Sequence, residues 1–155
     1  MKHRIDGLAQ NTLFTGQERI LFVDDEELFA DMECRMLARH GYKVTYTANS
    51  AEALNLFCFQ PEEFDLVITG FTMPVMTGTE LAHELLKIRP DIPIILCTAS
   101  SAVSSTEAAR LGIRGVMMKP LDSTMLAKVI RTMLDGNSDQ AKKSDDDGPY
   151  CISSV

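Results

Sequence analysis

The sequence has no surplus of positive charge and no long apolar run. Its 155 residues carry 15 Lys and Arg against 22 Asp and Glu, a formal net charge of -7. Nucleic-acid binding relies on basic patches that neutralise phosphates, so this balance argues against a nucleic-acid partner. No apolar stretch approaches the roughly 18 residues of a membrane span, and the basic residues 1–4 precede no apolar signal segment. We therefore expect a cytoplasmic protein without a membrane partner.

Several motifs of metal, nucleotide and hydrolase chemistry are also missing. The four cysteines show no CxxC or CxxH spacing, which argues against a metal centre built on them. We interpret Cys34, Cys58 and Cys97 as small core residues in a reducing compartment. A GxxxxGK(S/T) loop and a GxSxG turn are both absent, which excludes a P-loop nucleotide site and makes an esterase a poor interpretation.

The composition is that of one ordinary globular domain between two atypical ends. Hydrophobic residues make up 45% and charged residues 24% of the chain. Residues 1–18 show no clear period and are predicted to be a linker or an N-terminal arm. Residues 137–155 are polar and acidic, which predicts a disordered tail. The folded domain is therefore expected over 19–136.

Within 19–136, short apolar runs alternate with helical patterns. The predicted strands are 19–23, 42–47, 65–69, 92–99 and 115–120, each followed by a helical pattern, the fourth of these being a weak helix over 102–111. Strands that are apolar throughout are typical of a parallel sheet covered on both faces. Right-handed crossovers then favour an α/β fold: a flavodoxin-like, doubly wound, five-stranded parallel sheet of order 2-1-3-4-5 with five helices.

Helix boundaries have local signals. Gly41 is expected to end the first helix, Asn49 with Glu52 to cap the second, and Thr77 with Glu80 to form a capping box on the third. Leu28, Met32 and Met36 are expected on one face of the first helix, the face toward the core. Gly136 is expected to end the last helix.

Four polar residues and one glycine stand where the predicted strands end. Asp24 and Asp25 follow the first strand, Gly70 the third, Thr98 the fourth and Lys119 the fifth. In such sheets ligands bind beyond the carboxyl ends of the strands, so these positions should lie close together. Paired carboxylates suit Mg²⁺, and a lysine suits a phosphoryl oxygen. Taken singly, each has a plainer reading: a helix cap, a solvated turn lysine, a strand-forming threonine.

Four stretches together resemble one family. "ILFVDDEE", "DLVIT-x-FTMPVMTG", "IILCTA" and "GVMMKP" are similar to the receiver domain of two-component response regulators, most closely to receivers of hybrid sensor histidine kinases. The resemblance implies that Asp24, Asp25 and the main-chain carbonyl of Thr72 are metal ligands. It also implies a switch made by Thr98 and Lys119, with Val116 where the family usually has an aromatic residue. A cis Lys119–Pro120 bond is expected as well.

The resemblance makes Gly70 the anomalous position, because the family has its phosphoaccepting aspartate there. A chain without that carboxylate is expected to be a non-enzymatic, receiver-type signalling domain that acts by phosphorylation-independent protein contact. Mg²⁺ should bind weakly, and Lys119 should lean toward Asp24 or Asp25. The implied partner is a histidine kinase or another signalling protein, through the face made by helix 102–111, strand 115–120 and the last helix.

Two other functions stay open. One is a phosphoaccepting receiver whose aspartate is absent only in this variant. The other is a small flavodoxin-like enzyme, which the first turn disfavours because "DDEE" would repel a flavin phosphate. We accordingly expect neither a flavin nor a nucleotide cofactor.

Overall fold

The structure is a computed structural model that describes residues 15–101, 103–138 and 150–152. In chain order the elements are β1 (Arg19–Val23), α2 (Glu27–Arg39), β2 (Lys43–Thr47), α3 (Ser50–Phe59), the 3-10 turn η1 (Pro61–Glu63), β3 (Leu66–Gly70), α4 (Gly78–Ile88), β4 (Ile94–Thr98), α5 (Ser105–Arg110), β5 (Gly115–Met118), α6 (Ser123–Ser138) and β6 (Tyr150–Ile152). In the described part of the chain, no helix is both long and apolar enough to cross a membrane.

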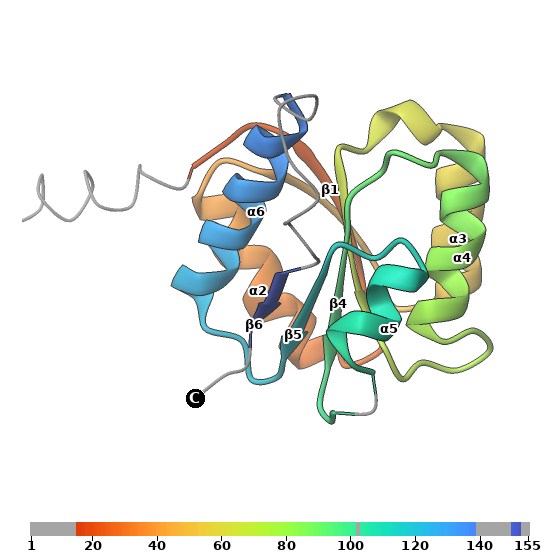
Figure 1. The fold of residues 1–155 in the computed structure, drawn as a ribbon. Helices are drawn as coiled ribbons and strands as arrows, with labels where there is room; N and C mark the ends of the chain where they lie inside the picture. Colours follow the sequence, from red (N-terminus) through yellow and green to blue (C-terminus); the bar gives the residue numbers. More distant parts are fainter. Residues whose placement is uncertain (1–14, 102, 139–149, 153–155) are drawn as a thin grey trace, which may run out of the picture.

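The strands form one parallel sheet in the order β2-β1-β3-β4-β5-β6. The predicted order 2-1-3-4-5 and the flavodoxin-like fold class are confirmed, with one more strand added beside β5. Helices α2 and α6 cover one face of the sheet and α3, α4 and α5 cover the other (Figure 1). The order places β1 and β3 side by side at the centre, where crossovers run in opposite directions along the sheet.

Strand side chains alternate between two apolar layers. Leu21 and Val23 of β1 face the layer under α3, α4 and α5, whereas Ile20 and Phe22 face the layer under α2 and α6. All four are buried, which explains why β1 reads as a continuous apolar run rather than an alternating one. Packing in both layers fixes the strands side by side, and because the strands are parallel, their carboxyl ends lie at one edge of the sheet.

Three of the predicted helix signals, at Gly41, Asn49 and Thr77, are confirmed. Gly41 follows α2 with φ +98°, a conformation that glycine adopts without a Cβ penalty. The Asn49 side chain accepts a hydrogen bond from the Glu52 N–H, and Thr77 and Glu80 form the reciprocal capping box. These caps fix where α3 and α4 start relative to the sheet.

The buried face of α2 differs from the prediction. Leu28 and Met32 are 85% and 68% exposed and only Met36 of the predicted face packs, partly buried, against the core, while Ala30, Glu33 and Leu37 are buried. Residues two apart lie on nearly opposite sides of a helix with 3.6 residues per turn, so burying Ala30 turns Leu28 outward. A glutamate in the core stripe concealed the true face, because the apolar pattern breaks at Glu33.

Two further predictions need correction. Cys97 is buried and Cys34 half-buried, but Cys58 is exposed on α3 and is not a core residue. Helix α6 continues through Gly136 to Ser138, since this glycine does not adopt the left-handed conformation that ends α2 at Gly41.

The acidic tail predicted to be disordered over 137–155 contains a strand. Residues 150–152 form β6, which pairs with β5 in parallel. The edge of β5 offers backbone N–H and C=O groups with which a further strand can pair, although the tail around 150–152 is polar. The rest of the predicted tail, 139–149 and 153–155, lies outside the described residues.

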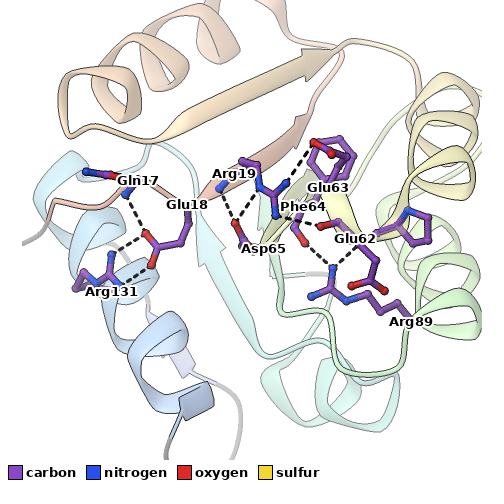
Figure 2. Close-up of polar contacts among 10 residues, drawn as sticks. Gln17, Glu18, Arg19, Glu62, Glu63, Phe64, Asp65, Arg89 and Arg131 are labelled. Carbon is purple, nitrogen blue, oxygen red and sulfur yellow. Dashed lines mark hydrogen bonds and ion pairs between the residues drawn. The ribbon is translucent and has the colours of Figure 1, made fainter.

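Ion pairs hold the end of the sheet opposite the predicted site, and Figure 2 shows them. Arg131 of α6 binds Glu18 at 2.8 Å and donates to the Thr15 carbonyl at 3.1 Å, so residues 15–18 dock on the domain. The backbone N–H of Arg19 donates to Asp65 Oδ2 at 2.8 Å, which ties the start of β1 to the start of β3. The predicted arm 1–18 is thus anchored at its described end, and 1–14 lie outside the described residues.

Candidate functional site

Three of the predicted site residues meet at the carboxyl edge of the sheet. Asp24 follows β1, Gly70 ends β3 and Lys119 follows β5. Lys119 Nζ lies 2.9 Å from Asp24 Oδ2, although β1 and β5 are separated in the sheet by β3 and β4. The peptide bond that follows Lys119 is cis, as predicted. The long lysine side chain therefore crosses the edge above Gly70.

The Asp24 carboxylate occupies the space beside Gly70. A Cβ placed on Gly70 would stand 2.7 Å from Asp24 Oδ2 and 3.1 Å from its Cγ. Real Cβ atoms do not approach other atoms this closely, so Gly70 has no room for a side chain while Asp24 keeps this position. The position of the Asp24 carboxylate therefore depends on the absence of a side chain at Gly70.

Lys119 is held on several sides. Its ammonium pairs with Asp24 and with Glu26, and lies 4.3 Å from the centre of the Phe29 ring, within range of a cation–π contact. Burial disfavours the charged lysine, but hydrogen bonds to Glu26 and Asp24 outweigh burial and raise the pKa of Lys119. The lysine is therefore a fixed cation of the site. The sequence predicted a contact with Asp24 or Asp25; the structure has the contact with Asp24 and adds one with Glu26 that was not predicted.

Asp24 is 1% exposed, and this burial has a cost. Its Oδ1 accepts from the Glu26 N–H at 2.8 Å, and the Tyr46 hydroxyl donates to its main-chain oxygen at 2.8 Å. Burial raises the pKa of Asp24 despite Lys119 and the Glu26 N–H, which act to lower it. The raised pKa of Lys119 indicates that the pair is favourable, whereas the raised pKa of Asp24 indicates that its burial costs more than the pairing returns. Since the 2.9 Å contact places opposite charges together, we take the pair as formed, with little net gain in stability.

The other predicted residues do not join this cluster through their side chains. Asp25 and Thr72 are exposed. The Thr98 hydroxyl donates to the Ser100 carbonyl at 2.9 Å and accepts from the Ser100 N–H at 3.2 Å, so it belongs to a local turn. Val116 is 4% exposed and packs in the layer under α3, α4 and α5. The position of Glu26 could have been anticipated from the run "DDEE", whereas the turn at Thr98 has no signal in the sequence.

The loop after β3 is fixed against Gly70 by a close backbone approach. The Gly78 N–H donates to the Phe71 carbonyl at 2.8 Å, and a Cβ on Gly78 would stand 2.0 Å from the Gly70 carbonyl oxygen. The first residue of α4 must therefore be glycine in this arrangement. Between them, Val75 has φ +73°, which is strained for a β-branched residue.

The acidic side chains do not present a ready site for a divalent cation. Among the described residues, no group of three or more His, Cys, Asp or Glu side chains could hold a metal ion. The Lys119 ammonium already pairs with Asp24 and Glu26 and balances one of their two negative charges, and Asp25 is exposed to solvent. A metal ion would have to displace Lys119 from Asp24 before this carboxylate could bind it.

Comparison with known proteins gives one family. The family model of the response regulator receiver domain matches residues 20–131. A response regulator receiver protein of Anaeromyxobacter is 38% identical over 66% of this chain and 43% of its own length. The aerobic respiration control sensor protein ArcB of Escherichia coli is 31% identical over 78% of this chain but only 16% of its own. The chain thus spans less than half of either relative.

Solved structures agree with this family. A CheY-like receiver domain of Methanospirillum hungatei has a TM-score of 0.74 at 29% identity, covering 81% of this chain and 99% of that one. The receiver domain of the hybrid histidine kinase CckA has a TM-score of 0.64 at 27% identity, covering 75% and 98%. Neither the family match nor these structures indicate a flavin or nucleotide site. This chain belongs to the response regulator receiver domain family.

Proposed function

We propose that this chain is a receiver-type signalling domain that lacks the phosphoacceptor and works through phosphorylation-independent protein contact. Receiver domains are signalling domains of two-component systems that interact with histidine kinases and other signalling proteins. The observation that carries the proposal is the site at Gly70. The position has no side chain, and the Asp24 carboxylate fills the space that a side chain would need.

The neighbouring hydroxyl groups are poor substitutes for the missing carboxylate. Attack on phosphorus needs an oxygen nucleophile that is in line and activated by a base. The Thr69 hydroxyl is fully buried and donates to the Gly70 carbonyl at 3.0 Å. Thr72 is exposed in the loop. We therefore assign the phosphoacceptor role to no residue of this chain and regard the domain as non-enzymatic.

Mg²⁺ is expected to bind weakly. Asp24, Asp25 and the Thr72 carbonyl would be its ligands, but Lys119 competes for Asp24 at 2.9 Å. The same lysine links the residue after β1 to the residue after β5, which favours a single arrangement of this edge. Lys119 is held by Asp24 and Glu26, and Thr98 is held in its own turn. Without a phosphoryl group at Gly70, neither residue of the switch pair would have a new group to bind.

The contact with a partner is assigned to the face of α5, β5 and α6. This face adjoins Lys119 through β5, so the arrangement of the site bears directly on it. A second observation also favours protein contact: Leu28 and Met32 stand exposed on α2, the helix that follows β1 and Asp24. Large apolar side chains gathered on one helix face are typical of surfaces that bind other proteins.

Mass spectrometry after treatment with a small phosphodonor and Mg²⁺ tests the proposal. The chain should gain no phosphoryl group, and Gly70→Asp should gain one through attack of the new carboxylate on phosphorus with departure of the donor's leaving group. A phosphoryl gain in the unaltered chain would overturn the proposal, because another residue would then be the acceptor. Gly70→Asn is the matched control, since its amide fills the same space without a nucleophilic carboxylate.

The alternative is a phosphoaccepting receiver whose aspartate is absent only in this variant. It predicts that Gly70→Asp regains phosphorylation together with full response at the face of α5, β5 and α6. A phosphorylated Gly70→Asp form whose face does not respond would favour the first proposal, because the remainder of the switch would no longer transmit the signal.

A further inference from the structure

Strand β6 covers what would otherwise be an open edge of the sheet. Tyr150, Cys151 and Ile152 pair in parallel with Gly115, Val116 and Met117 of β5. Figure 1 shows β6 alongside β5 at the end of the sheet, at the margin shared by the α5 and α6 faces. An unpaired edge strand is a template for other strands, so this pairing determines what β5 can bind.

The register identifies the backbone groups that β6 occupies. The Lys119 N–H donates to the Thr98 carbonyl of β4 at 2.8 Å. Backbone groups of successive residues point to opposite sides of a strand, so the N–H and C=O of Val116 point away from β4 and toward β6. In a parallel pair with Val116 opposite Cys151, these groups meet the Tyr150 carbonyl and the Ile152 N–H. The tail therefore pairs with the backbone of Val116 itself.

This pairing is short and tethered. It involves three residues of β6, and 11 residues (139–149) connect it to the end of α6 at Ser138. A strand of this length has few backbone contacts, so its occupancy depends on the high local concentration that the tether provides. A strand of this kind can be exchanged for another extended segment that pairs with the same edge.

We propose that residues 150–152 close the edge of β5 in cis, and that the same segment of a second copy of this chain can take their place there. In the closed state the tail satisfies the Val116 backbone. In the open state residues 150–152 leave, and residues 150–152 of a second copy add to the sheet by main-chain hydrogen bonds. This proposal depends on strand pairing alone and not on whether any residue of this chain accepts a phosphoryl group.

Two proline variants of the full chain provide a matched pair. Ile152→Pro removes the N–H that faces Val116. Cys151→Pro removes an N–H that faces away from β5, where proline is tolerated on edge strands. Hydrogen exchange at the Val116 amide should accelerate about tenfold or more in Ile152→Pro and far less in Cys151→Pro. Equal exchange in the two variants, or no acceleration in Ile152→Pro, would overturn the pairing.

The docking site is tested with a peptide of residues 148–155 added to each form. It should bind Ile152→Pro and bind the unaltered chain at least about tenfold more weakly, since the tethered tail competes for the edge. Equal binding to both forms, or no binding to Ile152→Pro, would overturn closure of the edge in cis. Protection of Val116 in the unaltered chain should not change on dilution. Protection lost on dilution would mean that the strand comes from a second copy, which would overturn closure in cis.

Discussion

Placing a carboxylate at Gly70 should destabilise the domain without Mg²⁺ and make its stability depend on Mg²⁺. The new Cβ would stand 2.7 Å from Asp24 Oδ2, whereas ordinary contact begins at 3.4 Å. The Asp24 carboxylate must therefore retreat by about 0.7 Å, the difference between these distances, which disturbs its 2.9 Å contact with Lys119. Gly70→Asp also places a third carboxylate beside Asp24 and Glu26.

The size of the effect has a steric and an electrostatic part. Forcing a side chain into a filled site costs about 1–3 kcal/mol. Two unit charges about 4 Å apart repel by about 4 kcal/mol at an effective dielectric constant of 20, and attraction by Lys119 at a similar distance offsets much of this repulsion. With desolvation included, we expect a charge contribution of about 1–2 kcal/mol. Gly70→Asp should thus lower the free energy of unfolding by about 2–5 kcal/mol, the sum of both parts.

Chemical denaturation with and without Mg²⁺ separates these parts. Gly70→Ala and Gly70→Asn carry the steric cost alone, so their stability should not depend on Mg²⁺. For Gly70→Asp, Mg²⁺ at about 100 times its dissociation constant should return about 2.7 kcal/mol. If Gly70→Asp is as stable as the unaltered chain without Mg²⁺, the Asp24 carboxylate does not fill the gap and the reasoning is refuted. An equal response of Gly70→Asn to Mg²⁺ would refute the electrostatic part.

Three further changes test the structure by denaturation. Burial raises the pKa of Glu33, so its protonated form stabilises the fold and this contribution is lost as pH rises through the folded pKa. Glu33→Gln should therefore raise the free energy of unfolding by about 1–3 kcal/mol at neutral pH and by less in acid. A gain that does not depend on pH would contradict this prediction. Gly78→Ala should lose about 1–3 kcal/mol through its 2.0 Å clash, whereas Gly136→Ala, with open space around it, should gain up to about 1 kcal/mol; equal effects would contradict the close approach. Lys119→Met leaves the Asp24 carboxylate without its cation and should cost about 1–3 kcal/mol, most of which Asp24→Asn should recover in the double variant; additive losses would show that the pair is not formed.

The strands and caps could be predicted because their signals are local or follow from burial on both sheet faces. The apolar run at Arg19–Val23 and the capping box of Thr77 and Glu80 each depend on a few adjacent residues. The face of α2 could not, because Glu33 is buried in the stripe that packs against the sheet and the apolar Met32 is not. Periodicity reports the average pattern of a helix, and tertiary packing can place one polar residue in the core against it.

The site was predictable in its location and only partly in its contacts. Strand topology places Asp24, Gly70 and Lys119 at one edge, so sequence order alone brings them together. Which oxygen Lys119 binds, and that Thr98 turns toward Ser100 instead, depends on side-chain rotation. Such rotations differ by small free energies that no sequence pattern reports. Strand β6 escaped prediction because its three residues stand in a polar tail and gain stability only from β5.

The proposed function, with glycine in place of an acceptor carboxylate, has a consequence for the cation that the site needs. Asp24 and Glu26 carry two negative charges, and one of these is balanced by Lys119, a cation that is part of the chain. With a third carboxylate, the same lysine would leave two charges unbalanced, and a divalent cation would be favoured. Under the proposed function, the glycine thus exchanges a soluble counterion for a tethered one, and occupancy of the site would not follow the supply of Mg²⁺ or of phosphoryl groups. Control of such a domain must act on an element that can still exchange partners, and the short β6 pairing at Val116 is an element of that kind.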